Sequence, residues 1–342
     1  MRVLIVKTSS MGDIIHTLPA VTDATNAIAG IRFDWVVEEA FKEIPQWHSA
    51  VDKVIPVAIR RWRKSPWKIW NSGEWQAFKE DLQAREYDAV IDAQGLIKSA
   101  YLVVRNAKGA SFGLDKASAK EPWASKVYQT PINIAKNQHA VERVRQLFAQ
   151  SLGYKLPEQQ GDFGIAEHFE SEAVQDYLVF NHSTTRVDKH YPEQYWLELI
   201  KLVTDQGWKI KLPWGNEQEK MRALRLAQKN NNVEVLEKLT LCEIAQVIAN
   251  AAACVSVDTG LSHLSAALNK PNITLFGPTD PGLVGGYGIN QVTLLAENYV
   301  KEFSHSSAAN KSVEPVVFRP LQAPTVWHEL QKLLKNRVVK EV

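Results

Sequence analysis

A short stretch in the last third of the chain combines residue types that bind anions. It runs from Cys254 to Leu264, where apolar and β-branched residues give way to Asp258-Thr259-Gly260 and then to a helical pattern. A strand, a tight turn and a helix in this order are typical of parallel α/β sheets, and the free backbone N–H groups at such a helix start converge on one point. We therefore expect this turn to hold a phosphate group, with a carboxylate or an imidazole gripping a group beside it.

The first turn of the chain, Lys7–Asp13, follows an apolar strand and so lies at the carboxyl edge of the predicted sheet, where open α/β sheets bind ligands. It contains only Gly12 where the dinucleotide fingerprint needs three glycines, and it lacks the Gly-Lys-Ser/Thr of a P-loop. Asp13 lies at or beside the start of the next helix. Two interpretations stay open for it: an N-cap that only complements the helix dipole, or a general base that faces a cleft.

Two more turns at a carboxyl edge are predicted in the second half of the chain. One contains hydroxyl groups and Lys189, which suit a diphosphate: the lysine as a point charge and Thr184 or Thr185 as a hydrogen-bond donor. The next one precedes Glu219, whose carboxylate could pair with ribose hydroxyls. Each turn also has a plainer interpretation, a solvated polar loop for the first and a helix-start acid that complements the dipole for the second.

The segment Arg60–Trp70 is both basic and aromatic and has no clean period. It could bind nucleic acid, lie against an anionic membrane surface or form a solvated loop. One short patch in a balanced protein does not favour sequence-specific binding of nucleic acid. The chain has no Asp-x-Asp pair and no Cys/His zinc spacing, so we expect no metal site, and a diphosphate would be held by helix N-termini and Lys189.

The composition is that of an ordinary globular enzyme. The 342 residues are enough for about two domains, hydrophobic residues make up 45% and the net charge is only +2, so attraction to an anionic partner must come from local clusters. Two cysteines do not suggest a disulfide framework and fit a reducing cytosol. The apolar run at the N-terminus is too short for a signal peptide, and no run reaches the length of a membrane span.

Strand-like runs alternate with helical patterns throughout, which favours doubly wound parallel sheets. The Pro-, Gly- and Gln-rich passage 153–164 is the best candidate for a linker, so we expect two halves of similar size with a ligand-binding cleft between them. The predicted strands are 3–6, 33–37, 53–57, 89–92, 111–114, 177–180, 209–212, 233–236, 254–257 and 273–276. The predicted helices are 13–29, 74–85, 96–105, 139–152, 192–204, 217–229, 241–251 and 327–334.

Four motifs in the same order resemble the lipopolysaccharide heptosyltransferases of Gram-negative bacteria, glycosyltransferase family 9. They are Arg2–Pro19, Asp92–Ser99, Thr184-Thr185-Arg186 with Asp188-Lys189, and Asp258–Leu264. The resemblance extends over essentially the whole chain. The family usually has an acid after Thr-Thr-Arg, where this chain has Val187.

The resemblance implies a GT-B fold with two Rossmann-like doubly wound domains facing each other across a cleft. It implies an acceptor-binding domain at 1–160, a donor-binding domain at 161–320 and a C-terminal helix at 321–342 that returns to the first domain. The implied reaction transfers heptose from ADP-heptose to a Kdo residue of Kdo-bearing lipid A. One base, no evident second nucleophile and an anionic leaving group fit a single displacement with inversion, and the lack of clustered carboxylates predicts that no metal is needed; no cofactor is expected, since ADP-heptose is a substrate. The enzyme would associate with the cytoplasmic face of the inner membrane as a peripheral protein.

The resemblance also assigns roles to individual residues. Asp13 would be the catalytic base. The donor would be bound by Thr184, Thr185, Lys189, Glu219, Asp258, Thr259, Gly260, Leu261 and His263, with Glu219 on the ribose, Asp258 on the heptose and the others at the diphosphate. The acceptor, with its phosphates and carboxylates, would be bound by Ser10, Gly12, Arg60, Arg61, Arg63, Lys64 and Lys98.

Three functions compete at this stage. The first is the inverting heptosyltransferase, acting on the first or the second heptose of the core. The second is a nucleotide-sugar epimerase of the same fold, for which the Arg60–Trp70 cluster would have no purpose. The third is a non-catalytic carrier of lipid or nucleotide, which the combination of Asp13 with the phosphate turns does not favour.

Overall fold

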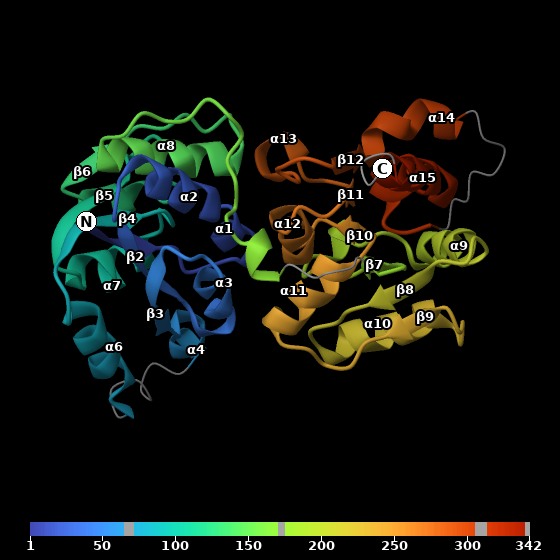
Figure 1. Ribbon diagram of the computed structural model, residues 1–342, viewed down its shortest axis with the longest axis horizontal. Helices are drawn as coiled ribbons and strands as arrows, with labels where there is room; N and C mark the ends of the chain where they lie inside the picture. Colours follow the sequence, from blue (N-terminus) through green and yellow to red (C-terminus); the bar gives the residue numbers. More distant parts are fainter. Residues whose placement is uncertain (65–71, 170–174, 305–312, 339–342) are drawn as a thin grey trace. The chain divides into compact units, whose positions relative to one another are not determined.

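The chain forms two compact units, Met1–His168 and Phe169–Val342. The computed structural model (Figure 1) describes residues 1–64, 72–169, 175–304 and 313–338. Each unit has its own parallel sheet with helices packed on it. Two Rossmann-like units are what the alternation of strand and helix patterns predicts, because parallel strands need crossover connections.

The sheet of the first unit has six described strands in the order β3-β2-β1-β4-β5-β6, all parallel. Its central strand β1 is buried along most of its length, as expected for a strand covered on both faces. The strands are β1 Arg2–Val6, β2 Arg32–Glu38, β3 Val51–Val57, β4 Tyr87–Asp92, β5 Gly109–Leu114 and β6 Thr130–Ile132. The helices are α1 Met11–Ile15, α2 Leu18–Ala27, α3 Glu43–Gln46, α4 Ile59–Lys64, α6 Glu74–Gln83, α7 Ile97–Leu102 and α8 Ala140–Leu152, with short 3-10 turns η1 Glu39–Phe41, η2 Val104–Asn106, η3 Pro122–Lys126 and η4 Ala166–Phe169.

The second unit repeats this architecture. Its described strands lie in the order β12-β11-β10-β7-β8-β9, again parallel, so β10 is in the same central position as β1. The strands are β7 Tyr177–Asn181, β8 Lys209–Leu212, β9 Val233–Val235, β10 Ala253–Val257, β11 Asn272–Phe276 and β12 Gln291–Leu295. The helices are α9 Glu193–Thr204, α10 Glu217–Ala227, α11 Leu241–Asn250, α12 Gly260–Ala267, α13 Pro281–Val284, α14 Val300–Ser304 and α15 Ala323–Val338, with 3-10 turns η5 Val187–Lys189, η6 Ala296–Tyr299 and η7 Val316–Phe318.

The long helix predicted at 13–29 is two helices, α1 and α2. Pro19 lies in the first turn of α2, where its missing N–H group is tolerated, but it could not donate within a continuous helix. The basic segment from Arg60 also differs from the expected aperiodic loop, because its first part is the helix α4. Its remainder, 65–70, lies outside the described residues.

The first unit extends beyond the predicted boundary at residue 160. Phe163 and Ile165 are buried, and a side chain at Gly161 would collide with Pro19 and Arg145. These contacts attach the end of the linker to the first unit. The unit therefore ends at His168.

The C-terminal helix, for which a return to the first domain was expected, lies within the second unit. Helix α15 packs against α9, β10 and β11. Its apolar side chains Val326, Leu330 and Leu333 join the core formed by these elements. Burial of this apolar face explains why the described helix stays with its own sheet.

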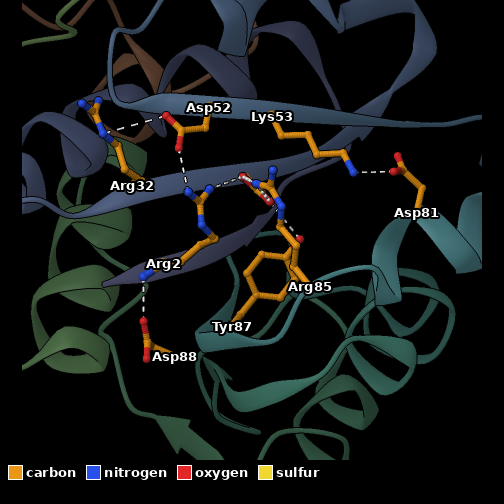
Figure 2. A network of polar contacts seen from close by, with 9 residues as sticks. Arg2, Arg32, Asp52, Lys53, Asp81, Arg85, Tyr87 and Asp88 are labelled. Carbon is orange, nitrogen blue, oxygen red and sulfur yellow. Dashed lines mark hydrogen bonds and ion pairs between the residues drawn. The ribbon is translucent and has the colours of Figure 1, made fainter.

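The strands of the first sheet begin in a cluster of paired charges, shown in Figure 2. Asp34 is fully buried and accepts hydrogen bonds from Arg2 at 3.0 Å, Arg85 at 3.1 Å and the Tyr87 hydroxyl at 3.0 Å. Arg2 also pairs with Asp52 at 2.9 Å. Because these carboxylates are compensated by neighbouring cations, this edge ties β1, β2, β3 and β4 together. The opposite edge contains the candidate site.

Candidate functional site

Asp13 lies in the first turn of α1, at the carboxyl end of β1. Its Oδ2 accepts hydrogen bonds from the backbone N–H of Ser10 at 2.7 Å and from the Ser10 hydroxyl at 2.8 Å. Ser10 is the N-cap and Asp13 the third helical residue, so the two form a capping box. The Asp13 side chain is nonetheless 46% exposed. The carboxylate is thus oriented by the helix start and accessible from solvent, and the two interpretations of this residue are compatible.

A buried lysine lies behind the Asp13 carboxylate. The Lys7 ammonium donates to the carbonyl of Ala93 at 2.7 Å and lies 3.9 Å from Asp13 Oδ1. Burial lowers the pKa of Lys7, while the charges of Asp13 and Asp92 oppose this change. Lys7 thus places a positive charge beside the Asp13 carboxylate without covering it.

The turn after β4 supports the Asp13 turn from the side. Gln94 Oε1 accepts from the backbone N–H groups of Thr8 at 2.9 Å and Ser9 at 3.0 Å. Asp92 is fully buried and accepts from Ser99 and from Tyr128, each at 2.9 Å. Burial raises the pKa of Asp92, although its hydrogen bonds act in the opposite direction.

These supporting roles of the β4 turn were not predicted from the sequence. The Asp92–Ser99 motif signalled only that the turn resembles a family, since neither the pairing of β1 with β4 nor the reach of Gln94 is visible in local spacing. The signal that could have found them is the position of both turns at the ends of buried strands, which meet at one edge if the strands are neighbours.

The predicted acceptor residues fall into three groups within the first unit. Ser10 and Gly12 belong to the Asp13 turn, and Gly12 is buried in α1. Lys98 is in the first turn of α7, which follows β4. The remaining four, Arg60, Arg61, Arg63 and Lys64, lie on α4.

The four cations of α4 differ in their surroundings. Arg61 forms ion pairs with Glu39 at 3.1 Å and Glu74 at 2.9 Å, and Arg60 lies over the ring of Phe41. Glu74 also accepts from the indole N–H of the buried Trp62 at 2.8 Å. Part of this cluster therefore anchors α4 to its neighbours.

The donor-binding candidates of the second unit converge around Asp258. Lys189 forms an ion pair with the Asp258 carboxylate, and both side chains are largely buried, at 16% and 8% exposed. The Thr184 hydroxyl donates to the Asp258 carbonyl at 3.0 Å. Because β7 pairs with β10, the turns that follow these two strands meet at the carboxyl edge.

The start of α12 completes this cluster. Thr259 is the N-cap with extended backbone, and Gly260 and Leu261 are the first two helical residues, so their N–H groups are among those without an acceptor within the helix. His263 is buried in the same helix. The backbone N–H groups of α12 and the Lys189 ammonium thus lie around the Asp258 carboxylate. Such donors suit a phosphate group, and the carboxylate suits a polar group next to that phosphate.

For two predicted donor-binding residues, Thr185 and Glu219, the contacts described are not with Asp258. Thr185 is exposed in the β7 turn. Glu219 lies in the first turn of α10, whose N-cap is Asn216, and its carboxylate accepts from the Gly215 N–H at 2.7 Å and the Asn216 side chain at 2.8 Å. The helix-start interpretation of Glu219 is thus confirmed, and a ribose contact stays a prediction.

The second unit also has a feature that was not predicted from the sequence, the buried His182 directly after β7. Burial lowers its pKa to about 3. Ser183 shares a hydrogen bond with its Nδ1 at 2.8 Å. A neutral imidazole therefore lies beneath the turn that carries Thr184 and Lys189.

In the described part of the chain, no cluster of three or more His, Cys, Asp or Glu side chains has the geometry to hold a metal ion. Within the same residues, no helix is long and apolar enough to cross a membrane.

Comparison with known proteins identifies the family. The model of glycosyltransferase family 9 (heptosyltransferase) matches residues 75–313, more than half of the chain. A lipopolysaccharide heptosyltransferase 1 of Escherichia coli O18:K1:H7 is 58% identical over 320 residues, which are 90% of this chain and 98% of the relative. A lipooligosaccharide heptosyltransferase 2 of Haemophilus influenzae is 34% identical over only 100 residues, 27% of this chain and 28% of the relative.

A solved structure agrees with the sequence comparisons. The structure of the E. coli heptosyltransferase WaaC with ADP has a TM-score of 0.89 and 54% sequence identity, and the match covers 97% of this chain and all of that one. This similarity confirms the predicted GT-B fold class. Together with the two parallel sheets and the matched family model, it establishes that the chain belongs to glycosyltransferase family 9, the heptosyltransferases.

Proposed function

We propose that this protein is the heptosyltransferase that transfers L-glycero-D-manno-heptose from ADP-heptose to a Kdo residue of Kdo-bearing lipid A, the first heptose of the lipopolysaccharide inner core. The observation that carries the proposal is the similarity to a heptosyltransferase 1 along nearly the full length of both chains. The similarity to a heptosyltransferase 2 is lower and covers about a quarter of the chain. Addition of the second heptose is therefore not favoured, and neither is nucleotide-sugar epimerisation.

The first unit supplies a base for this reaction. In the proposed step, Asp13 takes the proton from a Kdo hydroxyl while that oxygen forms a bond to the anomeric carbon of the heptose. The bond from that carbon to the diphosphate oxygen breaks, its electron pair stays on the diphosphate and ADP leaves. One displacement from the opposite face inverts the anomeric configuration, by analogy with inverting glycoside hydrolysis. The exposure of Asp13 and the cation behind it support this role.

The second unit supplies the charge that a diphosphate leaving group needs. The N–H groups at the start of α12 and the Lys189 ammonium are donors suited to phosphate oxygens, and they surround the Asp258 turn. We propose that Asp258 binds hydroxyls of the heptose while Lys189 binds the diphosphate. Thr184, Thr185 and His263 would complete the donor site, and Glu219 would contact the ribose.

The acceptor carries phosphates and carboxylates, so its recognition requires cations. We propose that Ser10, Gly12 and Lys98 contact the Kdo residues near Asp13, and that the α4 cations Arg60, Arg61, Arg63 and Lys64 bind the anionic groups further along the acceptor. Arg61 would bind less tightly than the others, because Glu39 and Glu74 already compensate its charge.

The experiment that tests the proposed function is mass spectrometry of the products from ADP-heptose and Kdo-bearing lipid A. We expect a product that is heavier than the acceptor by one heptose residue. The matched control is the same acceptor already carrying one heptose, which we expect to react far more slowly. Transfer only to the second acceptor, or conversion of the nucleotide sugar without an acceptor, would overturn the proposal.

We propose that the reaction needs neither a metal nor a cofactor, since helix N-termini and Lys189 can compensate the diphosphate. Activity should then persist in excess EDTA. Complete loss that magnesium restores would contradict this part of the proposal. We also propose that the enzyme acts at the cytoplasmic face of the inner membrane, because its acceptor is anchored in the lipid.

A further inference from the structure

Three large apolar side chains of the first unit are exposed on two short neighbouring elements. Ile97 and Tyr101 are each 40% exposed and lie one turn apart on α7, so they share a face of that helix. Trp123 on η3 is 60% exposed. Single exposed apolar side chains are common, but a group of this size that includes a tryptophan usually marks a contact surface.

The two elements form one surface. Their inner faces share a core, because Ala100 and Val103 on one side and Ala124 on the other belong to the same buried cluster. The starts of the elements are joined by a hydrogen bond of 2.6 Å from the Ile97 N–H to the carboxylate of Glu121. The outward side chains Ile97, Tyr101 and Trp123 therefore lie on adjacent outer faces, which we call the α7–η3 surface.

The chain segment that contains α7 and η3 is rich in positive charge. The sequence between residues 97 and 126 contains six Lys or Arg and only two acids, in a protein whose overall net charge is +2. Both acids have donors, since Glu121 accepts from Ile97 and Asp115 accepts from the Ser118 N–H at 2.8 Å. With six cations against two acids, the segment has an excess of positive charge. The basic residues are Lys98, Arg105, Lys108, Lys116, Lys120 and Lys126.

The cations and the rings are arranged in pairs. The Lys126 ammonium lies 3.9 Å from the centre of the Trp123 ring, and the Arg105 guanidinium lies 6.0 Å from that of Tyr101. Amphipathic rings with cations beside them are the residue types that occupy the boundary between lipid tails and anionic headgroups.

The surface borders the Asp13 turn. Helix α7 begins directly after the β4 turn, whose Gln94 holds Thr8 and Ser9. Burial is the main cause that lowers the pKa of Lys7, and the positive charge of Lys120 lowers it slightly further. A membrane docked on the α7–η3 surface would thus lie close to the proposed catalytic base.

We propose that the α7–η3 surface docks the enzyme on an anionic lipid bilayer, with Trp123 and Tyr101 at headgroup level and the surrounding cations on lipid phosphates. The proposal deepens the proposed function, because it names the surface through which the enzyme reaches a lipid-borne acceptor. In the alternative model, the enzyme would bind the membrane only through the cations of α4. Charge complementarity and exposed rings favour a bilayer over a protein partner as the occupant.

The test is co-sedimentation of the full chain with vesicles of phosphatidylglycerol and phosphatidylcholine, against vesicles of phosphatidylcholine alone. We expect binding to the anionic vesicles that weakens as salt is raised. Trp123→Ser should reduce the partition coefficient roughly tenfold and Lys126→Ala roughly fivefold. The matched control is Ile289→Ser in the second unit, whose side chain is 62% exposed, and it should change partitioning less than about twofold.

Several outcomes would overturn the proposal. They are no binding to anionic vesicles, wild-type partitioning of Trp123→Ser and Lys126→Ala, or equal loss with Ile289→Ser. Loss of binding only in Arg63→Ala with Lys64→Ala would assign the membrane contact to α4 instead. Thermal melting checks that each variant is folded. Heptose transfer to a detergent-dispersed acceptor is measured separately, so failure of the proposed function and failure of vesicle docking are distinguished.

Discussion

The Asp13 turn and the Asp258 turn are built alike but leave their carboxylates in different conditions. Each follows the central strand of a parallel sheet and opens a helix, α1 in one unit and α12 in the other. The Asp13 side chain is 46% exposed with Lys7 3.9 Å away, whereas Asp258 is 8% exposed and in direct contact with Lys189.

The groups behind the two turns also differ. Behind Asp13 lies a buried lysine, and burial lowers the pKa of that lysine. Beneath the Asp258 turn lies the buried His182, whose imidazole is neutral because burial lowers its pKa to about 3. The comparison shows that the same strand, turn and helix can position a carboxylate in two different environments. The charged groups around the turn then determine the role for which the carboxylate is suited. An accessible carboxylate can accept a proton, and a carboxylate paired with a lysine is suited to holding a ligand.

The sharpest test of this comparison is Asp13→Asn. The amide keeps the shape of the side chain but cannot accept the proton, so we expect kcat to fall about 10²–10⁴-fold. The dissociation constant for ADP-heptose, measured by calorimetry, should stay near that of the wild type. Asp258→Asn is the matched control and should weaken donor binding. Normal turnover of Asp13→Asn would remove Asp13 from the role of base.

Lys189→Ala tests the other side of the comparison. Loss of a charged hydrogen bond to phosphate should weaken ADP-heptose binding about 10–100-fold, because such bonds contribute about 1.5–3 kcal/mol. Calorimetric titration measures the effect. Lys201→Ala removes an exposed lysine of α9 that pairs with Asp205 at 2.7 Å, and it should leave donor binding unchanged.

Removal of Lys189 also leaves Asp258 buried without its cation, which could unfold the turn. The double variant Lys189→Ala with Asp258→Asn avoids this charge. If the double variant still binds the donor as tightly as the wild type, then Lys189 does not bind phosphate.

Acid should lower the stability of the second unit, because it contains the buried His182. The folded protein protonates this imidazole only near pH 3, while the unfolded chain does so near pH 6.5. Between these values the unfolded state binds more protons, so the stability present above pH 6.5 is lost as the pH falls towards 3. The expected loss is about 1.4 kcal/mol per pH unit. Urea unfolding at pH 7 and pH 5 measures it.

The variant for this test is His182→Gln, which should show a shallower dependence of stability on pH. His48→Gln is its counterpart in the first unit, because burial lowers the pKa of His48 to about 4. An unchanged slope in His182→Gln would contradict the assignment of the acid sensitivity to this residue.

The smallest expected effect concerns the capping box that orients Asp13. Ser10→Ala should cost about 1 kcal/mol of stability and reduce kcat a few-fold, because the hydroxyl that orients the carboxylate is lost. Thr240→Ala removes the equivalent hydroxyl from the capping box of α11, where Thr240 donates to Glu243 at 2.9 Å. It should cost similar stability and leave kcat unchanged. Equal kinetics of the two variants would show that Ser10 acts only as a cap.

Much of the fold could be predicted from the sequence, because periodicity and turn residues are local. The strand predicted at 3–6, the helix predicted at 192–204 and the turn after 257 follow from patterns of a few residues, and the structure has β1 at Arg2–Val6 and α9 at Glu193–Thr204. Other parts of the fold depend on distant contacts. The linker end stays with the first unit through Phe163 and Ile165, and α15 stays with the second through its core.

The sequence by itself indicated ten of the twelve described strands, all but β6 and β12, together with the position of Asp13 and Asp258 at carboxyl edges and the family. Only the tertiary structure decided which charged groups lie beside Asp13 and Asp258. Lys189 and Asp258 are 69 residues apart in the chain and meet because β7 pairs with β10. Local spacing encodes which residues share a helix or a strand, but ion pairing depends on which elements the fold brings together, and that is settled by burial of the whole core.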